Sequence, residues 1–340
     1  MSAWSHFGLF FGEAERDQAL AQREEAPLVA AWPALARPPA TGTPSLPEAR
    51  DSLHALALWG GFRFRWAGDE EAAARARAIV RDLVAGESAG EYHADAGALL
   101  AQAQCLELLR PFLREELAPL QGAWRQAWQQ LPRVWEYDEQ AWARLLQGVA
   151  GVLLEEEGHL EAAMTAHREA IERDLHPEGY WRPVVGEEMG AAPAGSFRRQ
   201  LRATQAYALL AEVVEQAQRN KRGQGFAPLW SFHKRHVSIR TAIAYCAYYY
   251  FYPEHWRWEA QPLRETASLF RQYGAFLELA LRRVPTRPLP LLLRELRPLF
   301  DVYGGGWTTL THGAASKRGT ASRDWRRWLD RWRQRLLVKG

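Results

Sequence analysis

Apolar positions recur along this chain with the spacing of amphipathic helices. Stretches of roughly 12 to 20 residues place apolar side chains three and four positions apart, with short polar breaks between them. The segment "DEEAAARARAIVRDLVAG" begins with acids and ends at Gly86, as a helix does. No run alternates apolar and polar residues with a period of two. The pattern predicts an all-α protein of about ten to twelve helices, paired and closed into a ring.

The length of 340 residues is large for one compact core but suits a closed, symmetric architecture. We therefore expect residues 1–340 to form a single domain. A long irregular stretch, "RPVVGEEMGAAPAGS" at 182–196, interrupts the helical pattern. Loops of this length in compact proteins are often functional lids, and a disordered connector is the alternative. We expect a mobile lid over 182–196.

The C-terminal residues 322–340 predict a basic amphipathic helix. Arginines fill much of one side, and the apolar stripe consists of Trp325, Trp328, Leu329, Trp332 and Leu336. Because a stripe of three tryptophans is unfavourable in water, we expect it to dock on the remainder of the protein. Binding to an anionic membrane surface or to nucleic acid is the alternative.

Composition narrows the classes of function without selecting one. The net charge of +3 is small for this length and argues neither for nor against a polyanionic partner, and no nucleic-acid partner is favoured. The two cysteines, Cys105 and Cys246, lie far apart in apolar stretches and predict buried thiols. No run of about 20 apolar residues predicts a transmembrane helix. The N-terminus lacks the pattern of a signal peptide, which predicts a cytoplasmic chain or a mature secreted one.

A helix stop followed by two large rings is the first candidate for a binding surface. In "DLHPEGYWRPVV" the helical pattern ends at Asp174, Pro177 prevents its continuation, and Gly179 permits an unusual backbone conformation. Tyr180 and Trp181 follow directly. The chain has sixteen tryptophans, and rings of this kind either pack in a protein core or stack on sugar rings. The rings could seal the core, but we expect Tyr180 and Trp181 to form the rim of a cleft and to contact the substrate.

Four segments, in order, resemble the alginate lyase and heparinase-like polysaccharide lyases. They are "HFGLFFGEAERDQALAQREEAPLVAAW", "HLEAAMTAHREAIERDLHPEGYW", "QLRATQAYALLAEVVEQA" followed by "GFAPLW", and "IAYCAYYYFYPEHWRW". The resemblance runs from about Phe7 to about Pro285. It implies an incomplete (α/α) toroid, helical hairpins around a deep aromatic cleft, in proteins that are usually periplasmic or secreted. The implied activity is β-elimination at a uronic acid of an acidic polysaccharide.

The resemblance also assigns roles to residues, beginning with the group that neutralises the uronate carboxylate. The Asn-His pair of the family falls on Glu139 and Gln140. Gln140 can still donate a hydrogen bond to a carboxylate, whereas Glu139 would repel a uronate unless it points away. A solvated position in the first turn of a helix is the alternative for Gln140. The departure from the Asn-His pair leaves a second reading open, in which a catalytically impaired toroid binds carbohydrate or serves as a scaffold.

The next helix carries the tyrosine that would accept the C5 proton and the arginine that would favour its phenolate. Tyr207 is the tyrosine of this helix, with ring packing in a helix interface as the alternative. Arg198, Arg199 and Arg202 compete for the arginine role, which we assign to Arg199, and the three together form a candidate carboxylate clamp. A solvated basic face is the alternative for these three.

Further aromatic residues are candidates for contact with sugar rings. Trp256 and Trp258 follow Pro253 in a turn, so at most one of them is expected to face a cleft. Tyr273 occupies an aromatic position that the resemblance places near the substrate, although core packing is equally compatible with its helix. The histidines lack the spacing of a zinc helix. No metal and no cofactor are therefore predicted, and the expected partner is an acidic polysaccharide or oligosaccharide.

Overall fold

The computed structural model describes nine segments of the chain, and all of them are helical or irregular. Among these residues the only β-type pairings are three isolated bridges, Leu175 with Trp181, Lys234 with Val237, and Asp301 with Gly306. The predicted all-α class is confirmed. The described residues are 6–38, 46–88, 95–132, 136–186, 195–220, 227–259, 263, 266–286 and 288–313.

The helices of the N-terminal half alternate between long inner helices and outer helices that cover them. The chain runs through two short helices, then three hairpin-like pairs, and ends this half in a single turn of π-helix. The elements are α1 (Glu13–Ala21), α2 (Leu28–Ala36), α3 (Leu46–Ala67), α4 (Glu70–Ser88), α5 (Ala96–Leu113), a 3₁₀ turn (Arg114–Glu116), α6 (Leu117–Gln129), α7 (Tyr137–Leu153), α8 (Glu157–Glu169) and the π-turn (Ala170–Asp174).

The C-terminal half contains one long helix and a set of shorter ones. The long helix, α10, is mostly buried over its whole length, whereas the later helices are only a few turns long. The elements are α9 (Arg182–Val185), α10 (Ser196–Asn220), α11 (Ile239–Phe251), a 3₁₀ turn (Pro253–His255), α12 (Thr266–Tyr273), α13 (Phe276–Arg283), α14 (Leu289–Leu296) and α15 (Thr308–His312).

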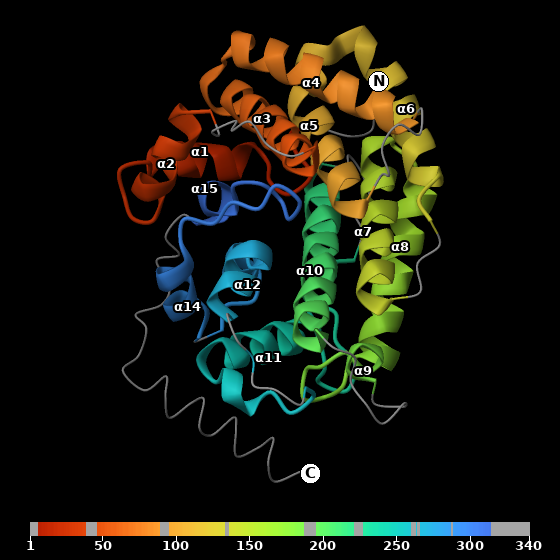
Figure 1. The fold of residues 1–340 in the computed structure, drawn as a ribbon, viewed down its shortest axis with the longest axis vertical. Helices are drawn as coiled ribbons and strands as arrows, with labels where there is room; N and C mark the ends of the chain where they lie inside the picture. The colour runs from red at the N-terminus through yellow and green to blue at the C-terminus, as the bar shows by residue number, and fades with distance from the viewer. Residues whose placement is uncertain are drawn as a thin grey trace.

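Neighbouring helices close into a ring. The inner helices α3, α5, α7 and α10 pack side by side. The ring closes through further contacts, in which α10 packs against α13, α13 against α15, α15 against α2, and α2 against α3. The outer helices α4, α6 and α8 cover this wall on the upper and right side of Figure 1. The helix termini of the ring therefore converge at common openings, where side chains from elements distant in sequence can meet.

Two glycines allow α7 to pack closely against α8 on one side and against α10 on the other. A Cβ atom at Gly151 of α7 would lie 2.6 Å from the backbone nitrogen of Leu160 in α8. At Gly148, one turn earlier, it would lie 2.4 Å from a side-chain carbon of Leu210 in α10. A larger residue at Gly151 would press on the backbone of α8, whereas one at Gly148 would require the Leu210 side chain to move.

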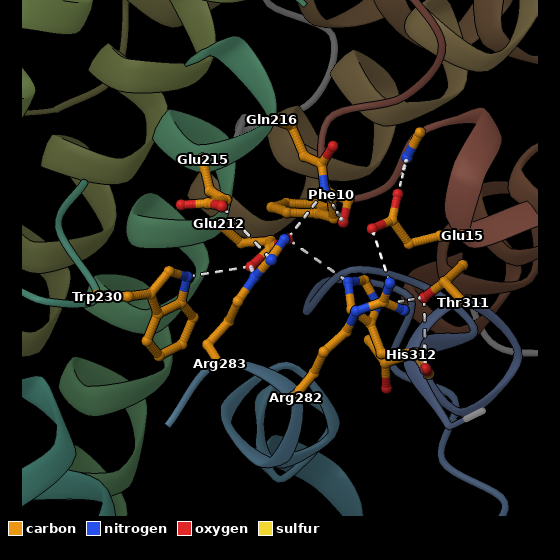
Figure 2. A network of polar contacts seen from close by, with 12 residues as sticks. Phe10, Glu15, Glu212, Glu215, Gln216, Trp230, Arg282, Arg283, Thr311 and His312 are labelled. Atoms are coloured by element: carbon orange, nitrogen blue, oxygen red, sulfur yellow. Dashed lines mark hydrogen bonds and ion pairs between the residues drawn. The ribbon is translucent and has the colours of Figure 1, made fainter. Parts of the chain in front are cut away.

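A buried charge network, which we call the Glu212 network, ties the N-terminal segment to the opposite side of the ring (Figure 2). Arg283 of α13 donates to both carboxylate oxygens of Glu212 in α10, at 2.9 and 2.5 Å. Glu15 of α1 contacts Arg219 at 2.8 Å and Arg282 at 3.1 Å. Three helices, α1, α10 and α13, are thus joined by paired charges, although α1 and α10 lie far apart in the sequence.

The turn after Asp174 has the predicted helix stop but the opposite orientation of its aromatic residues. Gly179 has a positive φ of 114°, and the backbone bridge between Leu175 and Trp181 closes the turn. Trp181 is 0% exposed, and its indole nitrogen donates to Thr204 Oγ1 at 3.0 Å. The rim hypothesis for Trp181 is therefore wrong: the turn directs the ring into the core, where α10 supplies a partner for its N–H.

The predicted lid is shorter than 182–196. Residues Arg182–Val185 form the short helix α9, and α10 already begins at Ser196. Positions 187–194, which contain most of the proposed lid, lie outside the described residues, as does the predicted basic helix at 322–340. Within the described chain, no helix combines the length and the hydrophobicity needed to cross a bilayer.

Candidate functional site

A cleft of about 470 Å³ lies where the starts of three inner helices meet the end of α12 and the turn at 301–306. It has the size of a ligand pocket. Residues distant in the sequence reach it because the ring brings these helix termini together. The described residues that line it are Asp95, Ala96, Gly97, Leu131, Pro132, Glu139, Trp142, Ala143, Arg202, Gln205, Gln272, Tyr273, Asp301 and Tyr303.

Three aromatic residues from three different elements line this cleft. Trp142 lies on α7, Tyr273 ends α12, and Tyr303 belongs to the turn at 301–306. Trp142 is 4% exposed, and its indole nitrogen has no hydrogen-bond partner among the described residues. Tyr303 is held from outside the cleft, because its hydroxyl donates to Asp51 of α3. Flat rings of this kind match the apolar faces of pyranose sugars.

Gln205 and Asp301 form the polar side of the cleft. The amide nitrogen of Gln205 donates to Asp301 Oδ2 at 2.7 Å, and the backbone nitrogen of Tyr303 donates to Asp301 Oδ1 at 3.0 Å. Gln205 is 1% exposed, and its amide oxygen has no partner in the described chain. Burial raises the pKa of Asp301 to about 6, although the hydrogen bond from Gln205 opposes this.

The turn that presents Asp301 requires glycine. A Cβ atom at Gly304 would lie 2.0 Å from Asp301 Oδ2 and 2.2 Å from Gln205 Nε2, so a side chain there would break their contact. Gly305 and Gly306 have positive φ angles of 106° and 74°, which other residues rarely adopt. The run of three glycines in the sequence is therefore explained by the geometry of this turn.

The charged residues of the cleft are Asp95, Glu139, Arg202 and Asp301. Arg202 lies 3.0 Å from Asp138 Oδ2, a carboxyl group whose pKa is raised chiefly by burial, against the attraction of Arg202. Glu139 is half-buried and makes no hydrogen bond or ion pair with any described residue. The one arginine of the described lining is thus already engaged by a carboxylate, whereas a glutamate is available.

The predicted proton acceptor, Tyr207, lies in the core and not at the cleft. It is 0% exposed, accepts a hydrogen bond from Arg144 and lies 3.4 Å from the hydroxyl of Tyr137, which in turn donates to Asp174 at 2.9 Å. Burial raises the pKa of Tyr207 despite the adjacent guanidinium. The expectation that an arginine would favour its phenolate is not met, because desolvation outweighs the nearby positive charge.

Gln140 also lies away from the described cleft lining. Its neighbours Glu139 and Ala143 line the cleft, whereas Gln140 shares a face of α7 with Tyr137 and Arg144, three and four positions away. Tyr137 and Arg144 contact Tyr207, so Gln140 lies on the side of α7 that faces Tyr207 and not on the side that lines the cleft. The predicted convergence of Gln140, Tyr207 and the arginines on one pocket is wrong for all but Arg202.

The three arginines at the start of α10 do not act as one clamp. Arg198 is exposed, and Arg199 pairs with Glu136 at 2.5 Å. Only Arg202 lines the cleft. Their spacing of one and three residues points them in different directions around the helix, which separates their side chains.

The predicted aromatic contacts also separate into core and cleft residues. Tyr180 and Trp256 are buried, and the indole of Trp258 donates to Tyr245 at 3.0 Å. None of these three lines the cleft, so the rim hypothesis is wrong for Tyr180 as well. Tyr273 does line it. Tyr180 packs against the imidazole of His176, with ring centroids 4.3 Å apart, which keeps it inside its own turn.

Sequence reasoning missed several residues of the cleft, chiefly Trp142, Gln205, Asp301 and Tyr303. Gln205 lies three positions after Arg202 on the same face of α10, so a helical-face argument from Arg202 would have included it, whereas Trp142 lies two positions after Gln140 on a different face of α7. Asp301 lies three positions before a run of glycines, a pattern typical of an acid that caps a tight turn. The described residues contain no group of three or more histidine, cysteine or acidic side chains that could hold a metal ion.

Comparisons with known proteins identify a shared fold but no sequence family. No family model matches the chain, and no curated protein matches it. Among solved structures, a tyrosine-to-phenylalanine variant of alginate lyase A1-III complexed with a tetrasaccharide superposes with a TM-score of 0.66 at 13% identity, covering 90% of this chain and 94% of that one. A histidine-to-alanine variant, also with a tetrasaccharide, gives a TM-score of 0.65 at 14% identity with the same coverage.

The chain therefore has the fold of the (α/α)-toroid polysaccharide lyases. One protein that it resembles is alginate lyase A1-III. A structure of that enzyme from Sphingomonas species A1 matches with a TM-score of 0.58 at 12% identity, covering 81% of this chain and 80% of that one. The predicted resemblance is confirmed at the level of fold.

Proposed function

We propose that this protein binds a saccharide chain in the cleft between α5, α7, α10, α12 and the turn at 301–306. The observation that carries this proposal is the combination of three aromatic side chains, Trp142, Tyr273 and Tyr303, with two polar groups that lack protein partners in the described chain. Rings supply stacking surfaces, and unpaired donors and acceptors supply sites for sugar hydroxyls. The fold shared with lyases crystallised with tetrasaccharides supports the same interpretation.

The test is a titration of the purified protein with tetrasaccharides of different charge, followed by calorimetry and by tryptophan fluorescence. Trp142 is in the cleft, so occupancy should change the emission. A Tyr273→Ala variant should weaken binding, and Tyr252→Ala is the matched control, because Tyr252 is also half-buried but does not line the cleft. Equal binding by wild type and Tyr273→Ala would place the ligand elsewhere, and the absence of binding by every saccharide would refute the proposal.

A second candidate is cleavage of an acidic polysaccharide by β-elimination. The observation in its favour is that Arg202 and Gln205 line the same cleft as Tyr273 and Tyr303. Arg202 or Gln205 would bind the uronate carboxylate, and a tyrosine would take the proton from C5. The electron pair of that C–H bond would form the C4–C5 double bond while the C4–O bond breaks, with its electrons remaining on the departing oxygen.

This reaction produces an unsaturated uronate with a characteristic ultraviolet absorbance. The assay would scan alginate, pectate, heparin, chondroitin and hyaluronan for that absorbance. If activity is found, Tyr273→Phe and Tyr303→Phe separate the two possible bases, and the variant of the true base should lose at least about a hundredfold in kcat. No absorbance change on any uronate polymer would leave saccharide binding as the function.

A further inference from the structure

The walls of the cleft carry more negative than positive groups. Among the described lining residues, Asp95, Glu139 and Asp301 are acidic, and Arg202 is the one cation. Asp138 lies 3.0 Å from Arg202, so the positive charge of that guanidinium is already compensated. A uronate entering this cleft would meet the carboxyl groups of Asp95, Glu139 and Asp301, and like charges at short range disfavour binding.

The acidic groups come from three separate elements and face one space. Asp95 precedes α5 and accepts from the backbone nitrogen of Ala98 at 2.8 Å. Glu139 lies in the first turn of α7 with no partner among the described residues, and Asp301 begins the turn held by Gln205. The three carboxyl groups therefore line one concave space together with the aromatic residues.

Two polar side chains of the cleft lining have an atom without a partner in the described chain. Trp142 and Gln205 are both more than nine-tenths buried, and the indole nitrogen of one and the amide oxygen of the other lack partners in the described chain. A buried polar atom without a partner costs free energy, so such atoms are usually satisfied by water or by a ligand. Both residues line the cleft.

From this juxtaposition we infer that the cleft selects saccharides that carry protonated amino groups, such as oligomers of glucosamine, over uronate oligomers. The ammonium group of the sugar lies near Glu139, and the aromatic residues bind the ring faces. The inference rests on the proposed saccharide-binding function and specifies its ligand. It also opposes the second candidate function, since β-elimination requires a uronate in the same cleft.

The experiment is a calorimetric titration of the whole protein with three tetrasaccharides, near pH 6.5 and at low salt. One is a tetramer of glucosamine, the second is the neutral N-acetylated tetramer, and the third is a tetramer of hexuronate. We expect the glucosamine tetramer to bind about tenfold more tightly than the neutral one, with the uronate tetramer weakest. Raising the salt concentration should reduce the advantage of the glucosamine tetramer, because exposed charges are screened.

A charge variant tests the assignment directly. Glu139→Gln should weaken the glucosamine tetramer about two- to fivefold and leave the neutral tetramer unchanged. Glu161→Gln, on the exposed side of α8, changes the net charge equally and should have no effect on either ligand.

Each outcome separates the inference from the function on which it rests. Tighter binding of the uronate tetramer, or an unchanged charge preference in Glu139→Gln, would overturn the inference while saccharide binding stands. Binding of none of the three tetramers would overturn saccharide binding itself, and the inference with it.

Discussion

The Glu212 network and the cleft contain similar side chains but use them in opposite ways. In the network, Glu212 accepts hydrogen bonds from Arg283, Gln216 at 2.9 Å and Trp230 at 3.0 Å, so both carboxylate oxygens are satisfied (Figure 2). In the cleft, Glu139 has no partner among the described residues. Satisfied buried charges fix the relative positions of helices, whereas unsatisfied ones remain available to a ligand.

The pKa shifts of the two regions follow the same division. Burial alone would raise the pKa of Glu212, but the hydrogen bonds and charges of Arg283 and His312 hold it well below its usual range. For Asp301 in the cleft, burial dominates and raises the pKa to about 6. The difference lies in the partners: Glu212 faces cations, whereas Asp301 faces an amide and backbone N–H groups.

The largest effect should follow from breaking the network. Arg283→Met leaves the carboxylate of Glu212 buried without its arginine, and we expect a loss of about 3 to 5 kcal/mol in the free energy of unfolding, measured by denaturant titration. Arg294→Met, at an exposed position of α14, is the control and should change stability by less than about 0.5 kcal/mol.

A double variant keeps this prediction testable if Arg283→Met does not fold. Adding Glu212→Gln removes the unpaired charge while keeping an acceptor for Trp230 and Gln216, so much of the lost stability should return. A loss below about 1 kcal/mol in the single variant would mean that the network contributes no more than a surface ion pair.

A substitution of Trp181 should have the next largest effect, and it tests whether this ring packs in the core or binds a ligand. Trp181→Phe removes the hydrogen bond to Thr204 and leaves a small cavity, so we expect a loss of about 2 to 3 kcal/mol in stability. Saccharide affinity should stay within about a factor of two. Trp128→Phe, at a half-buried tryptophan of α6, should cost less. Unchanged stability with a large loss of affinity would return Trp181 to the role of a binding platform.

Helix periodicity predicted the fold well but predicted the cleft poorly. The stop after Asp174 and the helices at α4, α7 and α10 follow from spacing, charge and glycine positions in the sequence. The orientation of Trp181 does not, since it depends on a hydrogen bond to Thr204 across the core. The same sequence pattern is compatible with a ring that faces water and with one that faces a neighbouring helix.

The candidate site was found only in part, for a related reason. Arg202 and Tyr273 were identified from the sequence and do line the cleft, whereas Gln140 lies on a neighbouring face of its helix. Errors of one or two residues rotate a side chain by 100° or more around a helix axis. Asp301 joins the cleft through a contact with Gln205, 96 positions away in the sequence, which no local pattern contains.

A variant of Tyr273 tests the cleft, as the Trp181 variant tests the core. Tyr273→Ala should weaken a saccharide ligand about five- to tenfold, because a stacking surface is lost, while stability changes by less than about 1 kcal/mol. This is the reverse of the result expected for Trp181→Phe. A fall in stability with affinity intact would make Tyr273 a packing residue.

The smallest effect concerns the proton on Asp301. Its raised pKa means that the folded protein retains this proton between its ordinary value of 3.8 and about 6, where the unfolded chain has released it. Asp301 therefore favours the folded state at low pH, and this contribution declines as the pH rises through 6.

For an amino-sugar ligand the direction is opposite, because only the ionised carboxylate attracts an ammonium group. Affinity should rise about twofold between pH 5 and 7, with a proton released on binding that calorimetry in buffers of different ionisation enthalpy detects. Asp301→Asn keeps an acceptor for Gln205 and should remove both the pH dependence and the proton release. If the pH dependence persists in that variant, another carboxyl group of the cleft is responsible, and Asp301 serves the turn alone.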